Sequence, residues 1–266
     1  MTVAIDKTVT VGNLRFHYRD WGGSGPVIVL LHDLGASAHS WDLVGPLLAG
    51  RQRVFAVDMR GHGLSDKPES GYTIAQCTKD LLAVLNGLQT KKAIVAGHGW
   101  GAALGLQAAA QAPKRVVALI HVGAGFGPRN QADLETAYAP PDQPGMFASA
   151  FRERLIAGSP HGLMTPAVEA ALMASCVIDE EDRVFPRLPE NARRALIADW
   201  AAFQPADLLK HLSCPLLVAV SQGDTLSPTL PDDAVVARLE DAQLPLPLQR
   251  PHGLAGHVQQ FLQEHV

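Results

Sequence analysis

Short runs of apolar residues recur along this chain and alternate with longer stretches of helical periodicity. The runs are continuous and rich in β-branched residues, a pattern typical of strands buried on both faces in a parallel sheet. They span residues 27–31, 53–58, 92–96, 115–122 and 216–220. Segments 40–48 and 73–88 between them have helical periodicity. The alternation of strands and helices predicts an α/β protein.

Two further regions depart from this pattern. Residues 8–18 alternate between polar and apolar side chains around Gly12-Asn13, which predicts a hairpin. Residues 128–205 are helical but irregular and contain many prolines, with candidate helices at 146–157, 166–176 and 190–203. Towards the end of the chain we expect a helix over 231–239, a proline-interrupted edge strand over 243–248 and a last helix over 255–265.

One stretch joins a buried strand to a helix of small residues through a glycine-rich turn. It reads Gly97-His98-Gly99-Trp100-Gly101 and is followed by the small apolar segment 102–110. This is the form of a nucleophile elbow, G-x-S-x-G, in which a strained turn presents a reactive side chain. The central residue is Gly99, so the position that should carry the nucleophile has no side chain.

Several motifs in this order resemble the α/β-hydrolase superfamily over nearly the whole chain. Besides the elbow, residues 32–35 are similar to His-Gly-x-Gly, residues 58–66 to D-x-R-G-x-G-x-S, and residues 223–228 lie where the family has its G-x-D loop. Trp100 makes the elbow most similar to that of epoxide hydrolases and haloalkane dehalogenases, which have aspartate at the position of Gly99. The resemblance implies an α/β-hydrolase fold, with a mostly parallel central sheet flanked by helices. It also implies a core at 1–127 and 206–266 and an inserted helical lid at 128–205.

The resemblance also implies which residues form the catalytic site. Nucleophile, acid and base map to Gly99, Asp224 and His252. We prefer His252 to His257 because His252 follows the expected last strand, whereas His257 falls on the final helix. The two oxyanion-hole N–H groups map to Leu34 and Trp100. Since both donors are backbone groups, changes of side chain need not remove them.

Asp33 is unusual because it replaces the first glycine of the family's His-Gly-x-Gly. A carboxylate that pointed into the pocket would oppose a developing oxyanion, so we favour an Asp33 side chain that points away and caps the following turn. His32 has the character of a hydrogen-bonded structural histidine, although its loop borders the expected pocket. The candidate substrate-contacting residues are His32, Asp33, His98, Tyr138 and Trp200.

Three functional readings stay open. The chain is an altered copy of an active hydrolase of esters, lactones, epoxides or haloalkanes, or it uses His252 and Asp224 as a general base without a nucleophile. The second reading extends to non-hydrolytic, cofactor-free lyase, cyclase or oxygenase chemistry. In the third, the chain is a catalytically silent module that binds a small ligand. We expect a hydrolase acting on a small or medium-sized apolar substrate under the lid.

The composition narrows the classes of partner. Of the 266 residues, 47% are hydrophobic and 18% are charged, with a net charge of −4. The chain has no basic patch for nucleic acid and no apolar run that could span a membrane. Its three cysteines have no metal-ligand spacing and its start lacks a signal peptide's apolar stretch. We therefore expect a cytoplasmic monomer or homodimer without metal or organic cofactor, whose partner is a small molecule.

Overall fold

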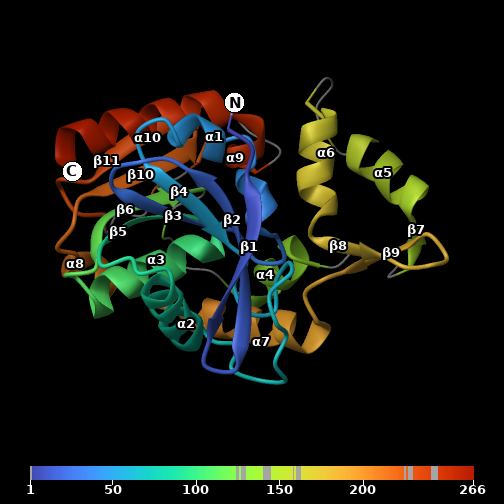
Figure 1. Ribbon diagram of the computed structural model, residues 1–266. Coiled ribbons are helices and arrows are strands. Elements are labelled where there is room, and N and C mark those ends of the chain that lie inside the picture. Colours follow the sequence, from blue (N-terminus) through green and yellow to red (C-terminus); the bar gives the residue numbers. More distant parts are fainter. Residues whose placement is uncertain are drawn as a thin grey trace.

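Within the described residues, a twisted sheet of eight strands forms the centre of the protein (Figure 1). The computed structural model describes residues 2–123, 126, 130–139, 145–157, 159, 163–224, 226, 230–240 and 245–266. The strands are β1 (Ile5–Val11), β2 (Leu14–Gly22), β3 (Val27–Leu31), β4 (Arg53–Val57), β5 (Ala93–His98), β6 (Val116–Val122), β10 (Leu216–Ser221) and β11 (Val235–Leu239). Their order is β1-β2-β4-β3-β5-β6-β10-β11, and every pair from β4 to β11 is parallel. The predicted fold class is confirmed.

Helices cover both faces of this sheet. One face carries η1 (Ala38–Trp41), α1 (Gly45–Leu48), α9 (Leu246–Gln249) and α10 (Pro251–His265), and the other carries α2 (Ile74–Gly87), α3 (Trp100–Gln111) and α8 (Pro205–Lys210) (Figure 1). Successive strand residues point to opposite faces, so Val29 and Leu31 join one core cluster while Ile28 and Leu30 join the other. This double burial explains the continuous apolar runs of the sequence.

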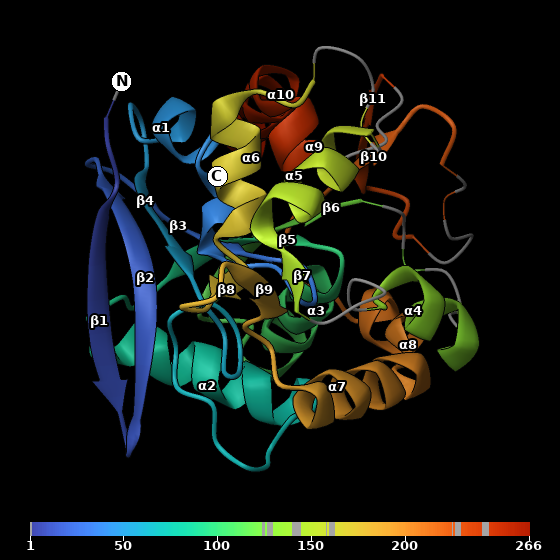
Figure 2. The same cartoon turned by 90° about the vertical axis from the view of Figure 1, so that its right-hand side faces the viewer.

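The segment between β6 and α8 lies beside the carboxyl ends of the strands (Figure 2). It contains α4 (Gln131–Ala137), β7 (Met146–Phe147), α5 (Ala148–Ala157), α6 (Pro166–Met173), β8 (Cys176–Ile178), β9 (Arg183–Pro186) and α7 (Glu190–Ala202). The strands form a small antiparallel sheet, β7-β9-β8, that the sequence pattern did not reveal. Helix α7 packs on the central core through Leu196, Ile197 and Trp200. Helix α6 packs on Leu248 of α9 through Val168 and Ala171, so the segment contacts the core at two places.

The C-terminal region differs from its predicted secondary structure. The helix expected over 231–239 is wrong, because β11 pairs in parallel with β10 over 235–239. The edge strand expected over 243–248 is also wrong, because α9 begins at Leu246, and residues 243 and 244 lie outside the described part. Proline is tolerated in the first turn of a helix, where no backbone N–H is needed. Pro247 and Pro251 therefore lie in the first turns of helices here, and the last helix starts at Pro251 rather than at 255.

Candidate active site

The register of two neighbouring strands brings Asp33 and Gly99 together. Strands β3 and β5 run in parallel with Leu31 opposite Gly97, and each chain continues two residues further to Asp33 and Gly99. A Cβ atom added to Gly99 would lie 2.2 Å from Oδ1 of Asp33. The carboxylate of Asp33 therefore occupies the space that an elbow side chain would need.

The elbow itself has the expected strand–turn–helix form. Gly99 is the N-cap of α3 and has a φ of 51°, a conformation that glycine adopts without penalty. The turn is tight, because a Cβ at Gly97 would lie 2.4 Å from the amide nitrogen of Ala102. A Cβ at Gly101 would lie 2.5 Å from the carbonyl oxygen of His32. This close approach places the first turn of α3 directly against the loop that carries Asp33.

Two backbone N–H groups converge on one oxygen of Asp33. The amides of Leu34 and Trp100 each donate to Oδ1 at 2.8 Å. Trp100 is the first residue of α3, and the N-terminus of a helix favours negative charge. The expectation that Asp33 points away from the pocket is wrong. The two N–H groups assigned to the oxyanion hole do meet at one point, where they bind the protein's own carboxylate.

The second oxygen of Asp33 faces the lid segment and a histidine. The hydroxyl of Tyr138, just after α4, donates to Oδ2 at 2.8 Å. Nδ1 of His98 lies 3.7 Å from the same oxygen. The side chains of Asp33 and His98 are 15% and 13% exposed, so both are shielded but accessible. One carboxylate thus contacts two strand ends and the lid.

Asp33, His98 and Tyr138 border a cavity of about 180 Å³. Its other walls come from Ala171, Leu172, Ser175, Pro245 and Leu248, among others. A larger cavity of about 510 Å³ adjoins it and shares Leu34, Tyr138 and Ser175. Apolar side chains of the lid, Phe151, Phe185 and Leu188, line the larger cavity, with Glu190 and Arg193 among its polar residues. The size and lining suit a small or medium-sized, mainly apolar molecule.

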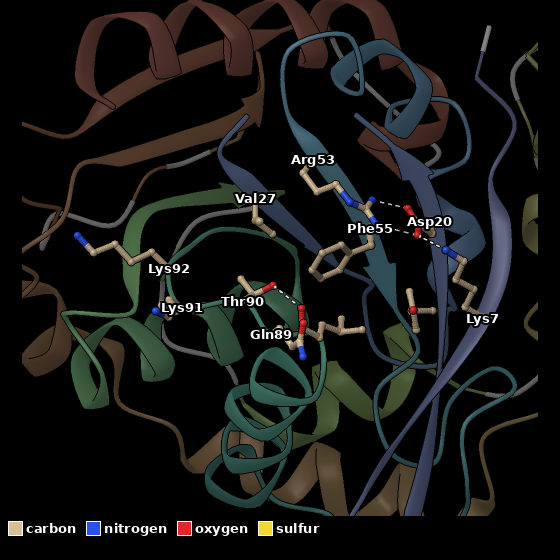
Figure 3. Close-up of a pocket in the computed structure, with 11 residues that line it drawn as sticks. Lys7, Asp20, Val27, Arg53, Phe55, Gln89, Thr90, Lys91 and Lys92 are labelled. Carbon is tan, nitrogen blue, oxygen red and sulfur yellow. Dashed lines mark hydrogen bonds and ion pairs between the residues drawn. The ribbon is translucent and has the colours of Figure 1, made fainter. Parts of the chain in front are cut away.

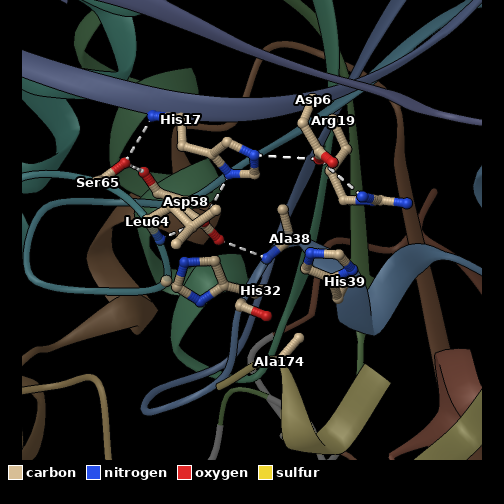
Figure 4. Close-up of polar contacts among 12 residues, drawn as sticks. Asp6, His17, Arg19, His32, Ala38, His39, Asp58, Leu64, Ser65 and Ala174 are labelled. Carbon is tan, nitrogen blue, oxygen red and sulfur yellow. Dashed lines mark hydrogen bonds and ion pairs between the residues drawn. The ribbon is translucent and has the colours of Figure 1, made fainter. Parts of the chain in front are cut away.

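A buried carboxylate supports the loop from behind (Figure 4). Oδ1 of Asp58 accepts the amide of Ala38 at 2.6 Å, and Oδ2 accepts the amide of Leu64 at 2.9 Å and lies 2.7 Å from Nδ1 of His17. Burial opposes the charge, but these hydrogen bonds, with His17 foremost, hold the pKa of Asp58 well below its usual range. The D-x-R-G motif therefore fastens the loop after β3 and takes no part in chemistry.

We expected His32 and Trp200 to contact the substrate, but neither side chain lines either of the two cavities at the site. His32 is fully buried, and its Nδ1 donates to the carbonyl of Asp33 at 2.8 Å while its Nε2 accepts the amide of Met59 at 3.0 Å. Burial lowers the pKa of His32, so the ring is neutral and fixes the loop. Trp200 is buried with its ring centroid 5.5 Å from that of Tyr138. It orients Tyr138 and lines neither cavity.

Asp224 and His252 do not form a pair. Oδ2 of Asp224 accepts the amide of Ser221 at 2.9 Å, within its own turn. His252 is exposed in the first turn of α10, and no hydrogen bond or ion pair joins it to Asp224 among the described residues. The expected loop position of His252 is wrong, because α10 begins at Pro251 and β11 is the last strand of the described part of the chain. Residues 240–245, where the family would place its histidine, contain none.

The sequence signal that would have found Asp33 was present in two motifs. Compared with the family motifs, Gly99 lacks the nucleophilic side chain at the end of one strand, and Asp33 has a side chain where the family has glycine at the end of another. Parallel strands present their carboxyl ends at the same edge of the sheet, so a paired loss and gain predicts a transferred side chain. The link required knowing that these two strands are neighbours.

A separate cavity of about 500 Å³ lies at the opposite edge of the sheet (Figure 3). It is bordered by the beginnings of β3 and β4, at Val27 and Arg53. Ligands of open α/β sheets bind at the carboxyl ends of the strands. The charge of Asp20 here is neutralised by Lys7 and Arg53, whose Nζ and Nη2 atoms lie 2.7 Å from its Oδ2. We therefore place the candidate site at Asp33.

Two further observations concern metal-binding clusters and membrane-spanning helices. Within the part of the chain that is described, three or more His, Cys, Asp or Glu side chains nowhere gather in a way that would hold a metal ion. Every helix in the same described ranges is too short or too polar to cross a lipid bilayer.

The comparisons with known proteins agree with the fold. Residues 26–159 match the model of the alpha/beta hydrolase fold family. The chain is 32% identical to RutD of Variovorax paradoxus over 250 residues, which cover 92% of this chain and 90% of that protein. It is 29% identical to 2-(acetamidomethylene)succinate hydrolase of Mesorhizobium japonicum over 203 residues, covering 76% and 63% of the two chains. The protein belongs to the α/β-hydrolase family.

Solved structures show the same fold. The crystal structure of E-2-(acetamidomethylene)succinate hydrolase has a TM-score of 0.79 at 22% identity and covers 98% of this chain and 99% of that one. The enol-lactonase from Burkholderia xenovorans LB400 has a TM-score of 0.74 at 21% identity, covering 97% and 100%. Three longer mycobacterial relatives match over only 30% of their length. The two curated relatives described above, RutD and 2-(acetamidomethylene)succinate hydrolase, are both named as hydrolases, and the chain is a hydrolase by family.

Proposed function

We propose that this protein hydrolyses a small or medium-sized, mainly apolar substrate in the cavity under the lid, and that Asp33 is its essential carboxylate. The observation that carries the proposal is the position of the Asp33 carboxylate. It fills the space of the missing elbow side chain, with one oxygen on two backbone N–H groups and the other at the cavity.

Among the substrate classes considered, epoxides fit this site best. A carboxylate that attacks a saturated carbon forms a stable ester, whereas attack on an ester carbonyl would form a reactive anhydride. The hydroxyl of Tyr138 lies 2.8 Å from Oδ2 and can donate to an oxygen that leaves a carbon near Asp33. Haloalkanes have no leaving oxygen to accept this proton, and esters and lactones remain the second choice.

The test is turnover by the wild type and two matched variants. Styrene oxide, cyclohexene oxide, phenyl acetate and 1-bromobutane are supplied to the wild type, Asp33→Asn and Asp207→Asn. Asp207 is an exposed carboxylate on α8 and controls for the loss of one negative charge. We expect hydrolysis of the epoxides by the wild type and Asp207→Asn. We expect loss of a factor on the order of 10⁴ to 10⁶ in kcat for Asp33→Asn.

A catalytically silent small-ligand-binding module is the second candidate. It is favoured by the absence of any histidine in residues 240–245 and by the turn-internal hydrogen bond of Asp224. If no substrate is turned over, while styrene oxide or its diol raises the melting temperature of the wild type, the hydrolase proposal fails and the binding module replaces it.

A further inference from the structure

The two oxygens of the Asp33 carboxylate have different surroundings. Oδ1 is held by the amides of Leu34 and Trp100, each at 2.8 Å. Oδ2 contacts the hydroxyl of Tyr138 at 2.8 Å and lies 3.7 Å from Nδ1 of His98, at the cavity. One oxygen is therefore anchored, and the anchoring points the other at the place where a substrate would lie.

We infer that Oδ2 of Asp33 is a covalent nucleophile, located on the loop after β3 instead of on the elbow. This inference rests on the proposed function. Oδ2 bonds to an epoxide carbon, and the bond between that carbon and the ring oxygen breaks. The ring oxygen takes the proton of the Tyr138 hydroxyl. The products of this step are an ester of Asp33 with a hydroxyalkyl group and a Tyr138 phenolate.

Water completes the reaction at the carbonyl carbon of this ester. His98 Nδ1 takes one proton from the water as its oxygen bonds to Cγ of Asp33. The negative charge develops on Oδ1, where the Leu34 and Trp100 amides already point. The bond from Cγ to the former Oδ2 then breaks, and the diol takes the proton from His98. The acid proton on Asp33 returns to Tyr138, so that epoxide and water yield diol and the starting protein.

The same geometry opposes a role for Asp33 as a simple base. Asp33 accepts three hydrogen bonds, two from amides at Oδ1 and one from Tyr138 at Oδ2. Nucleophilic attack uses Oδ2 while Oδ1 keeps both amide bonds, and the later oxyanion forms where donors already lie. If water attacked the substrate directly, no negative charge would develop on Oδ1, and the amides of Leu34 and Trp100 would have no role in the reaction.

The first experiment follows the oxygen atom of water. Excess wild-type protein reacts once with styrene oxide in H₂¹⁸O, and the peptide containing Asp33 and the diol are then analysed by mass spectrometry. We expect one ¹⁸O atom in Asp33 and none in the diol. Label in the diol alone overturns the nucleophile but leaves the proposed hydrolase intact. Absence of turnover by any substrate of the panel overturns the proposed function, and this inference with it.

The second experiment traps the covalent ester. His98→Gln keeps a side chain of similar size but removes the base, so we expect the protein to gain the mass of one styrene oxide on Asp33. Asp33→Asn keeps an oxygen for the two amide donors and should show no adduct, while Asp207→Asn should incorporate label as the wild type does. If His98→Gln does not fold, label incorporation by the wild type still decides the inference. An adduct on any residue other than Asp33 overturns it.

Discussion

Two places along the carboxyl edge of the sheet contrast sharply. At the ends of β3 and β5, Asp33, His98 and two backbone amides converge on one point, joined by Tyr138. At the ends of β10 and β11, Asp224 is engaged in its own turn and His252 is exposed on α10. The first group follows from direct pairing of adjacent parallel strands. The predicted pairing of Asp224 with His252 depended on the length of irregular segments, which the sequence pattern did not define.

After the loss of activity expected for Asp33→Asn, the largest expected effect tests which histidine serves the site. His98→Gln should lower kcat for epoxide hydrolysis by about 10² to 10⁴-fold, because it removes a general base beside Asp33. KM should fall together with kcat, because slower hydrolysis of the ester on Asp33 lets this ester accumulate. Steady-state kinetics with styrene oxide measures both. An unchanged kcat would show that another group activates water.

The next effect concerns the space shared by Asp33 and Gly99. Gly99→Ser should lower the free energy of unfolding by about 1–3 kcal/mol, because the new Cβ meets the Asp33 carboxylate and φ is 51°. Adding Asp33→Gly should recover part of this loss. Urea unfolding of the wild type, both single variants and the double variant gives the coupling energy. Strict additivity would mean that the two positions do not compete for space.

A smaller effect is expected from pH. Burial lowers the pKa of His32 and lowers that of His62 well below its usual range, so both are neutral in the folded protein. As pH falls below about 6.5, the unfolded chain binds protons that these folded-state rings reject, and stability decreases.

His17 behaves in the opposite sense. Burial opposes protonation of His17, but its contacts with Asp58 and Asp6 together outweigh burial and raise its pKa. Its contribution is complete below pH 6.5 and fades only as pH rises through the raised folded-state pKa. Below pH 6.5 the loss of stability therefore comes from His32 and His62. Melting curves at pH 7, 6 and 5 should show a Tm that falls by about 2–4 °C for each kcal/mol of stability lost. His62→Gln should flatten this dependence, and a constant Tm in the wild type would contradict the assignment.

The smallest expected effect comes from the other end of the comparison. His252→Ala should leave kcat/KM within about twofold and change the free energy of unfolding by less than about 0.5 kcal/mol, because the side chain is exposed. Kinetics and urea unfolding alongside His98→Gln provide the comparison. A large loss of activity in His252→Ala would restore this histidine to the site.

The core of the fold was readable from the sequence. The run at 27–31 coincides with β3, and the helix expected over 73–88 is α2, which Thr73 caps. The elbow at Gly99 was located correctly because glycine spacing encodes a tight turn between strand and helix. The lid boundaries at 128 and 205 stay a prediction. The strand at 235–239 was missed because a short edge strand with one exposed face carries a weak apolar signal.

The sequence by itself determined that this chain has an α/β-hydrolase core and that its elbow lacks a nucleophilic side chain. These properties are local, since apolar runs and glycine turns are encoded by neighbouring residues. Only the tertiary structure decided that Asp33 fills the vacated space and that, among the described residues, no hydrogen bond or ion pair joins Asp224 to His252. The reason is that strand register brings residues 66 positions apart in the sequence, Asp33 and Gly99, into contact. A pattern of neighbouring residues does not predict a contact between positions so far apart in the sequence.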